Sequence, residues 1–200
     1  MQIVIGITGG TGCGKTTALQ ALKTLGFHII DCDALYHQLL ERDRELLFAL
    51  EQAFPGVVED GVLSRKKLGQ QVFSDEAALS RLNETTWPFV RRAVQEELQV
   101  YTPQPCAIDA VGLLESGLGK LCTHTVAITA PEETRIARLC AREGISQDYA
   151  RLRIRAQKEN EVFAAACGLT IENNDSCAAD FQNRCAAIFQ ELLKEELPHA

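Results

Sequence analysis

The sequence predicts an α/β fold with three layers, in which a five-stranded parallel sheet is covered by helices on both faces. Short runs rich in apolar and β-branched residues alternate with longer runs of helical periodicity, which is the pattern of β-α-β units. The first apolar run, QIVIGIT, leads directly into a glycine-rich loop. The chain of 200 residues is 46% apolar and 24% charged, which suffices for one compact domain with a sizeable core.

The alternation of patterns predicts where each element lies. We expect strands near residues 2–7, 27–31, 105–111, 123–130 and 167–172. We expect helices near residues 15–25, 33–42, 43–53, 64–72, 75–100, 131–142, 146–164 and 176–195. Helices alone interrupt the alternation in the middle of the chain. The sequence therefore predicts a single domain with a core of about 1–33 and 102–200, a helical insertion of about 34–101 and a lid of about 138–158.

Composition and charge narrow the class of protein. The formal net charge of −7 argues against general binding to nucleic acid, and no apolar run is long enough to span a membrane. The first residues lack the basic and apolar regions of a signal peptide, so we expect a cytoplasmic protein. The eight cysteines are scattered without a C-x-x-C pair, and we expect them to be thiols.

The loop GGTGCGKTT, which follows the first strand, matches the phosphate-binding motif G-x-x-x-x-G-K-[ST] of P-loop proteins. Glycines let backbone N–H groups close around phosphate oxygens, and the N-terminus of the next helix adds partial positive charge. We expect Lys15 to reach the β- and γ-phosphates of ATP and the Thr16 hydroxyl to coordinate Mg²⁺. The alternative is a glycine-rich turn without a ligand. The predicted ATP-binding residues of this loop are Gly10, Thr11, Gly12, Cys13, Gly14, Lys15, Thr16 and Thr17.

The second predicted strand ends in two acids, Asp31 and Asp33. The carboxyl end of a parallel strand beside the P-loop strand faces the crevice in which α/β sheets bind ligands. A carboxylate there can accept the proton of an attacking hydroxyl and help to hold Mg²⁺. Each acid has a structural alternative, and for Asp31 it is the N-cap of the following helix.

A basic segment follows the fourth predicted strand. Residues 135–158 carry seven basic and two acidic side chains, and Arg138 and Arg142 lie four residues apart on one predicted helix. Like charges at this spacing repel unless a ligand such as a polyphosphate relieves them. Arginines on a closing lid can stabilise a phosphoryl group during transfer, although a solvated basic face is the alternative. With no N-K-x-D motif for guanine present, these features favour a small-molecule kinase over a GTPase.

Six segments in order resemble one known family. They are IGITGGTGCGKTT, IIDCDALYHQLL, LSRKKLGQQVF at 63–73, DAVGLLESGL at 109–118, RIRAQ at 153–157 and LTIENN at 169–174. Together they resemble the dephospho-CoA kinases nearly from end to end. The resemblance implies transfer of the γ-phosphoryl group of ATP to the ribose 3′-hydroxyl of dephospho-CoA, which gives CoA and ADP in the last step of CoA synthesis.

The resemblance also implies roles for individual residues. Asp33 is expected to be the general base, and Arg138 and Arg142 to face the transferred group together with Lys15. Asp109 is expected to support Mg²⁺ with Thr16, while Gln157 and Asn173 approach the adenine end of ATP. Arg65 belongs to the insertion that binds dephospho-CoA.

One departure from the family concerns the acceptor. Trp87 and Pro88 stand where the family usually has His-Pro. Trp87 is a candidate to bind the substrate, but the interpretation we favour is a core tryptophan, since this residue is usually largely buried. A kinase for another hydroxyl acceptor and a non-catalytic nucleotide-binding regulator are the alternatives for the whole chain. We expect a monomer or a weak homo-oligomer.

Overall fold

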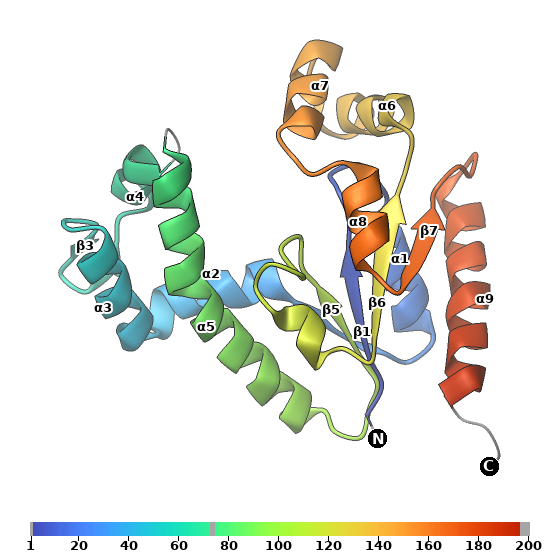
Figure 1. Ribbon diagram of the computed structural model, residues 1–200, viewed down its shortest axis with the longest axis horizontal. Coiled ribbons are helices and arrows are strands. Elements are labelled where there is room, and N and C mark those ends of the chain that lie inside the picture. The colour runs from blue at the N-terminus through green and yellow to red at the C-terminus, as the bar shows by residue number, and fades with distance from the viewer. Residues whose placement is uncertain (1, 73–74, 197–200) are drawn as a thin grey trace.

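A five-stranded parallel sheet forms the centre of the computed structural model, which describes residues 2–72 and 75–196. The strand order is β2-β5-β1-β6-β7, and all neighbours run parallel (Figure 1). The α/β fold predicted from the sequence is confirmed. The strands are β1 (Val4–Thr8), β2 (His28–Asp31), β5 (Cys106–Asp109), β6 (His124–Thr129) and β7 (Leu169–Glu172).

The central strand β1 determines where a ligand can bind. All five of its residues are buried, as expected for a parallel strand covered on both faces. The chain leaves β1 toward β2 and β5 on one side and later continues to β6 and β7 on the other. The strand order therefore reverses at β1, and the crevice at such a reversal is where open α/β sheets bind ligands. The P-loop begins at the carboxyl end of this strand.

Two helices cover one face of the sheet. Helix α1 (Lys15–Thr24) packs beside α9 (Ala178–Glu196), and both bury apolar side chains against β1 and β6 (Figure 1). The C-terminal half of α5 (Glu76–Val100) contributes Val90, Val94 and Leu98 to a core cluster with β5. This cluster also contains the short 3₁₀ helix η1 (Leu118–Leu121).

The insertion between β2 and β5 has a core of its own. It contains α2 (Cys32–Arg42), α3 (Arg44–Ala53), β3 (Val58–Glu59), β4 (Val62–Leu63), α4 (Arg65–Val72) and α5. Leu46, Leu50 and Phe54 of α3 and its C-cap are fully or almost fully buried in this cluster. Since α5 contributes to both clusters, it links the insertion rigidly to the sheet.

The expectation that helices alone make up the insertion was wrong, because β3 and β4 form a small antiparallel hairpin. Asp60 and Gly61 at its turn have φ angles of 51° and 77°, and two successive residues in the left-handed region are typical of a tight hairpin turn. The strands have two residues each, too few for a periodic pattern.

The single helix expected over 146–164 is in fact two, α7 (Gln147–Arg155) and α8 (Asn160–Ala166). Between them, the side chain of Gln157 accepts a hydrogen bond from Thr11 of the P-loop, a tertiary contact that helical periodicity does not reveal. Helix α6 (Glu132–Glu143) ends at Gly144, whose φ is 67°, and packs with α7 as a hairpin around Ile136, Leu139 and Ile154.

The sequence also led us to expect free thiols and no membrane-spanning segment. All eight cysteines are free thiols, as expected. Over the described ranges, none of the helices has the length and apolar character needed to cross a lipid bilayer.

Candidate active site

The P-loop connects β1 to α1 and lines a small open pocket of about 270 Å³. Lys15, the first residue of α1, donates a hydrogen bond from Nζ to the carbonyl oxygen of Gly9 at 2.8 Å. Gly14 has a φ of 103°, and a Cβ atom there would lie 2.3 Å from Nδ2 of Asn173. The pocket is lined by Gly10, Thr11, Gly12, Gly14, Lys15, Thr16, Thr17, Arg138 and Arg142.

This pocket brings together most of the residues predicted to bind phosphate, from two distant parts of the chain. Cys13 is the exception within the loop, because its side chain is fully buried in the core beneath. Burial raises the pKa of the Cys13 thiol, although Arg135 and Lys15 oppose that shift. The Cys13 thiol is therefore not available to a ligand.

Arg138 and Asn173 support the loop from behind. Arg138 donates from Nη1 to the carbonyl oxygens of Gly12 and Cys13 at 3.3 and 3.4 Å and from Nη2 to Oδ1 of Asn173 at 2.9 Å. Asn173 is 3% exposed, and its Nδ2 donates to the carbonyl oxygen of Cys13 at 2.9 Å. Asn173 thus contacts the loop directly, and it holds Arg138 at the pocket.

Arg135 contacts the P-loop although sequence reasoning gave it no role there. It is 3% exposed, and its Nε donates to the carbonyl oxygen of Thr11 at 2.8 Å. The predicted ATP-binding residue Gln157 contacts the same residue, since its Oε1 accepts from the Thr11 N–H at 2.7 Å. The sequence signal was only the position of Arg135 in the basic segment.

Arg142 lies at the mouth of the pocket with a side chain that is 60% exposed. Its guanidinium pairs with Glu143, which also pairs with Arg153 of α7. Hydrogen bonds from Arg142 and from Arg153 lower the pKa of the Glu143 carboxyl. Arg151 pairs in turn with carboxylates of α6 and α7, so acidic partners offset much of the basic segment.

Three carboxylates lie at the carboxyl ends of β2 and β5. Asp31 caps α2, since its Oδ1 accepts from the Ala34 N–H at 2.9 Å, and it aligns with Asp109 across the two strands. Asp33 is exposed in the first turn of α2. Burial raises the pKa of Asp109, Lys15 opposes this, and Asp31 and Asp33 add to it.

Lys15 experiences the same group of charges. Burial lowers the pKa of its ammonium, and Asp109, Cys13 and Asp33 partly oppose that shift. The P-loop lysine and the carboxylates are therefore close enough to act on one another. Lys15 lines the phosphate pocket, whereas Asp33 lines a second pocket.

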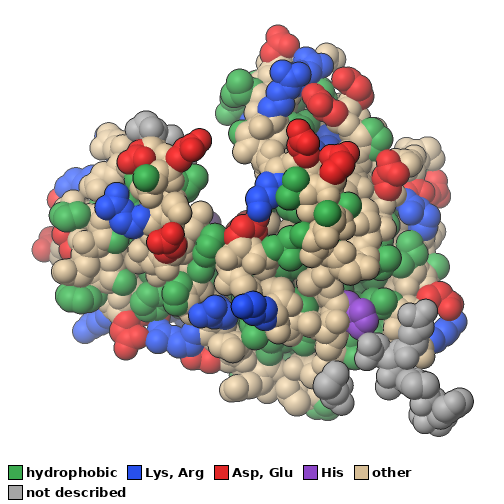
Figure 2. All heavy atoms as spheres, viewed as in Figure 1, with side chains coloured by type: hydrophobic (Ala, Val, Ile, Leu, Met, Phe, Trp, Pro, Cys, Tyr) green, Lys and Arg blue, Asp and Glu red, His purple; other side chains and the backbone are tan. Residues whose placement is uncertain are grey.

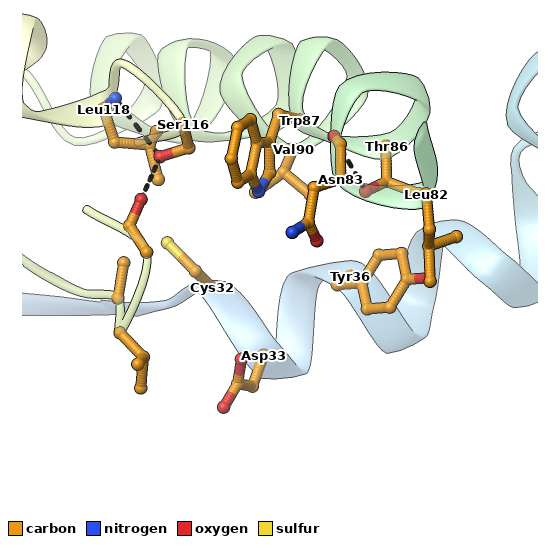
Figure 3. Close-up of a pocket in the computed structure, with 13 residues that line it drawn as sticks. Cys32, Asp33, Tyr36, Leu82, Asn83, Thr86, Trp87, Val90, Ser116 and Leu118 are labelled. Carbon is orange, nitrogen blue, oxygen red and sulfur yellow. Dashed lines mark hydrogen bonds between the residues drawn. The ribbon is translucent and has the colours of Figure 1, made fainter. Parts of the chain in front are cut away.

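The second pocket, of about 200 Å³, lies between α2, α5 and the loop after β5. Figure 2 shows the molecule hollowed between the insertion and the rest of the chain. Asp33 and Tyr36 of α2 lie on one side of the pocket, and Asn83 and Trp87 of α5 lie on the other (Figure 3). The remaining lining residues are Cys32, Leu82, Thr86, Val90, Ala110, Val111, Gly112, Ser116 and Leu118.

The interpretation of Trp87 as a core residue was wrong. Trp87 is half-buried, belongs to none of the core clusters and lines the second pocket. Its spacing of four residues from Asn83 and three from Val90 places all three on one face of α5, which borders the pocket. Arg65 is not among the lining residues and is exposed at the start of α4. The charge of Arg65 nevertheless acts on Tyr36. Burial raises the pKa of the Tyr36 hydroxyl, and Arg65 partly opposes that rise.

The acids do not form a ready-made metal site, since no group of three potential ligands is close enough in the described part of the chain. Mg²⁺ in kinases usually takes one or two protein oxygens and completes its shell with phosphate and water. The exposed Thr16 hydroxyl and the Asp109 carboxylate are oxygen donors of this kind, beside the phosphate pocket.

Comparison with known proteins identifies the family. The family model for dephospho-CoA kinase matches residues 3–179. The chain belongs to the dephospho-CoA kinase family. A dephospho-CoA kinase of Dehalococcoides mccartyi is 35% identical over 97% of this chain and 98% of its own length. One of Lactobacillus acidophilus is 30% identical over 98% of this chain and 100% of its own.

Solved structures agree with this assignment. TT1252 from Thermus thermophilus matches with a TM-score of 0.76 at 34% identity, covering 96% of this chain and 98% of that one. The dephospho-CoA kinase from Campylobacter jejuni matches with a TM-score of 0.70 at 26% identity, covering 98% and 100%. A shikimate kinase from Bacteroides thetaiotaomicron, at 17% identity, shares the fold alone.

Membership confirms the activity that the six segments implied. The enzyme has dephospho-CoA kinase activity, uses ATP and acts at the final step of CoA synthesis. The two alternatives, a kinase for another acceptor and a regulator, are thereby set aside. Phe73, the last residue of the segment at 63–73, lies outside the described residues.

Proposed function

We propose that this kinase transfers the γ-phosphoryl group of ATP to the ribose 3′-hydroxyl of dephospho-CoA with Asp33 as the general base. One observation carries the proposal: Asp33 lines the second pocket, while its charge acts on Lys15 of the phosphate pocket. A hydroxyl held in the second pocket can give its proton to Asp33 as its oxygen attacks the γ-phosphorus. The exposed position of Asp33 leaves its oxygens free to accept that proton.

The P-loop and the arginines would bind the other substrate. Backbone N–H groups of the loop and the ammonium of Lys15 bind the phosphates, and Arg138 and Arg142 neutralise charge on the group in transfer. We assign residues of about 138–158 to a lid that brings Arg142 to the phosphates. Gln157 and Asn173 serve ATP by fixing the loop, through the contacts at Thr11 and Cys13. Their assignment to the adenine end stays a prediction.

Thr16 and Asp109 would hold Mg²⁺ together with the phosphates of ATP. The metal neutralises phosphate charge and helps to orient the transferred group. Asp109 also interacts with Lys15, so it helps to keep the ammonium charged beside the phosphates.

The insertion of about 34–101 would bind dephospho-CoA. Trp87 and Tyr36 offer aromatic surfaces on opposite sides of the second pocket, and an adenine ring can stack on such a surface. Arg65 lies close enough to act on Tyr36, so we assign it to an anionic part of the acceptor. The cytoplasmic location and the monomeric or weakly associated state stay predictions.

The Asp33→Asn variant tests the role of the base. We expect ATP binding close to wild type and turnover reduced by roughly 10²-fold or more, because the amide cannot accept the proton. Glu41→Gln, which removes one charge from an exposed position on the same helix, is the matched control and should retain turnover. The assay follows ADP release with dephospho-CoA, adenosine or AMP as acceptor, and CoA formation by mass where dephospho-CoA is the acceptor. Near-normal turnover of Asp33→Asn would remove Asp33 from this role.

A further inference from the structure

Arg135 is a buried cation without a counter-ion in the described part of the chain. Its side chain lies beneath the P-loop and is 3% exposed, yet no described carboxylate lies within ion-pair distance. Arg151, on the next helix, has three carboxylates around it. A desolvated charge is unfavourable unless it is paired, so the position of Arg135 requires an explanation.

The contacts of Arg135 converge on one residue of the loop, Thr11. Its Nε donates to the carbonyl oxygen of Thr11 at 2.8 Å, and its Nη2 donates to Oε1 of Gln157 at 3.3 Å. The same Oε1 accepts from the Thr11 N–H at 2.7 Å. Thr11 is thus held at both its N–H and its C=O by side chains from α6 and from the segment after α7.

The loop fits closely around this arginine. A Cβ atom at Gly10 would lie 2.4 Å from Nη2 of Arg135, and one at Gly12 would lie 3.0 Å from the Arg135 carbonyl oxygen. The phosphate-binding motif leaves positions 10 and 12 open to any residue. Here the guanidinium of Arg135 occupies the space that a side chain at position 10 would need, whereas Gly12 meets the backbone of Arg135 and has a φ of 78°, which itself favours glycine.

We propose that Arg135 is a positioning residue for ATP, which fixes the shape of the P-loop and places an unneutralised positive charge beneath it. The polyphosphate of ATP supplies the missing negative charge, so Arg135 favours the ATP-bound state over the empty one. The acceptor pocket does not include Arg135. The effect should therefore fall on ATP and spare dephospho-CoA. The inference rests on the proposed binding of ATP at the P-loop, but not on the proposed base or acceptor.

The test compares Arg135→Gln, Arg135→Lys and the control Lys23→Gln. Each Gln variant removes one positive charge from a helix that adjoins the P-loop, but Lys23 is exposed in the last turn of α1, at the end away from the loop. We expect Arg135→Gln to raise the Kd of ATP, measured without acceptor, about tenfold and to leave the KM of dephospho-CoA within about twofold. Arg135→Lys keeps the positive charge, so the Kd of ATP should rise by no more than about threefold, which is half of the tenfold effect on a logarithmic scale. Lys23→Gln should bind ATP like the wild type.

Three results would overturn the inference. They are unchanged ATP binding in Arg135→Gln, an equal weakening of both substrates with a matching fall in Tm, and a Lys variant no better than the Gln variant. Should Arg135→Gln fail to fold, Gln157→Ala removes the hydrogen bond to the N–H of the same residue, Thr11. It must then weaken ATP without affecting dephospho-CoA. Because binding is measured without acceptor, failure of the Asp33 assignment would leave these results interpretable.

Discussion

Replacing Asn173 by alanine tests whether the buried contacts behind the P-loop stabilise the fold and the ATP site together. The amide makes one neutral hydrogen bond to Cys13 and one to the charged Arg138, both at 2.9 Å. A neutral bond contributes about 0.5–1.5 kcal/mol, and one to a charged group contributes about 1.5–3 kcal/mol. Arg138 is only half-buried and keeps its other contacts, so we take the lower part of the summed range, about 2–3 kcal/mol.

This loss translates into a measurable change in Tm. In a protein of this size each kcal/mol shifts Tm by about 2–4 °C, so Asn173→Ala should lower Tm by about 4–12 °C. Its KM for ATP should rise about tenfold, because Arg138 loses the group that holds it at the phosphate pocket.

Asn160→Ala is the matched control for this experiment. Asn160 also donates from Nδ2 to a backbone carbonyl at 2.9 Å, that of Ala130, but its Oδ1 has no partner among the described residues. Loss of a single neutral bond should lower Tm by about 1–6 °C, less than in Asn173→Ala, and leave the KM for ATP unchanged. The assay is thermal unfolding monitored by circular dichroism, combined with initial rates. Equal Tm values for the two variants would refute the reasoning.

Further predictions concern the charges and the thiol of the site. Lys15→Ala should reduce turnover by about 10²-fold or more, while Lys23→Ala in the last turn of α1 should not; equal rates in a steady-state assay would reject the P-loop assignment. Burial raises the pKa of the Asp109 carboxyl in the folded protein above its ordinary value of 3.8. The folded protein therefore binds this proton more tightly than the unfolded chain does. The stability that Asp109 contributes is present below pH 3.8 and is lost as the pH rises through the pKa of the folded state. Asp109→Asn should therefore raise Tm by about 2–4 °C at pH 7, by an amount that shrinks toward pH 4, and lower turnover at least about tenfold; a lower Tm at pH 7 contradicts this. Iodoacetamide should modify the exposed Cys177 well before the buried Cys13 and leave ATP turnover nearly intact, which peptide mass spectrometry can check; comparable rates at the two thiols would exclude the burial argument.

The parts of the fold with strong local patterns could be predicted from the sequence. The strand before the P-loop and the helix after it followed from an apolar run and a motif that requires them. The hairpin at 58–63 was missed, although its Asp60-Gly61 pair is a recognised turn signal. Two-residue strands carry no periodicity, so only the turn could have revealed them.

The site was predictable only where its residues belong to motifs. The P-loop lysine and Asp33 belong to motifs that begin at the end of a strand, and their place at the edge of the sheet comes from topology. Arg135 differs, because nothing in a run of basic residues indicates which one points under a loop more than a hundred positions earlier. Trp87 differs as well, since a half-buried side chain on a pocket wall has the same helical spacing as a core residue.

The pairing of Glu143 with Arg142 and Arg153 has a consequence for how an anion meets the arginines. A single carboxylate engages both guanidinium groups in the empty protein, so any incoming anion must compete with an internal one. The Arg142 side chain is 60% exposed, so water screens its pair with Glu143, and a phosphate held at the P-loop can replace the carboxylate at little cost. The empty protein thus keeps the guanidinium of Arg142 at the mouth of the pocket, next to the position that the phosphates would take.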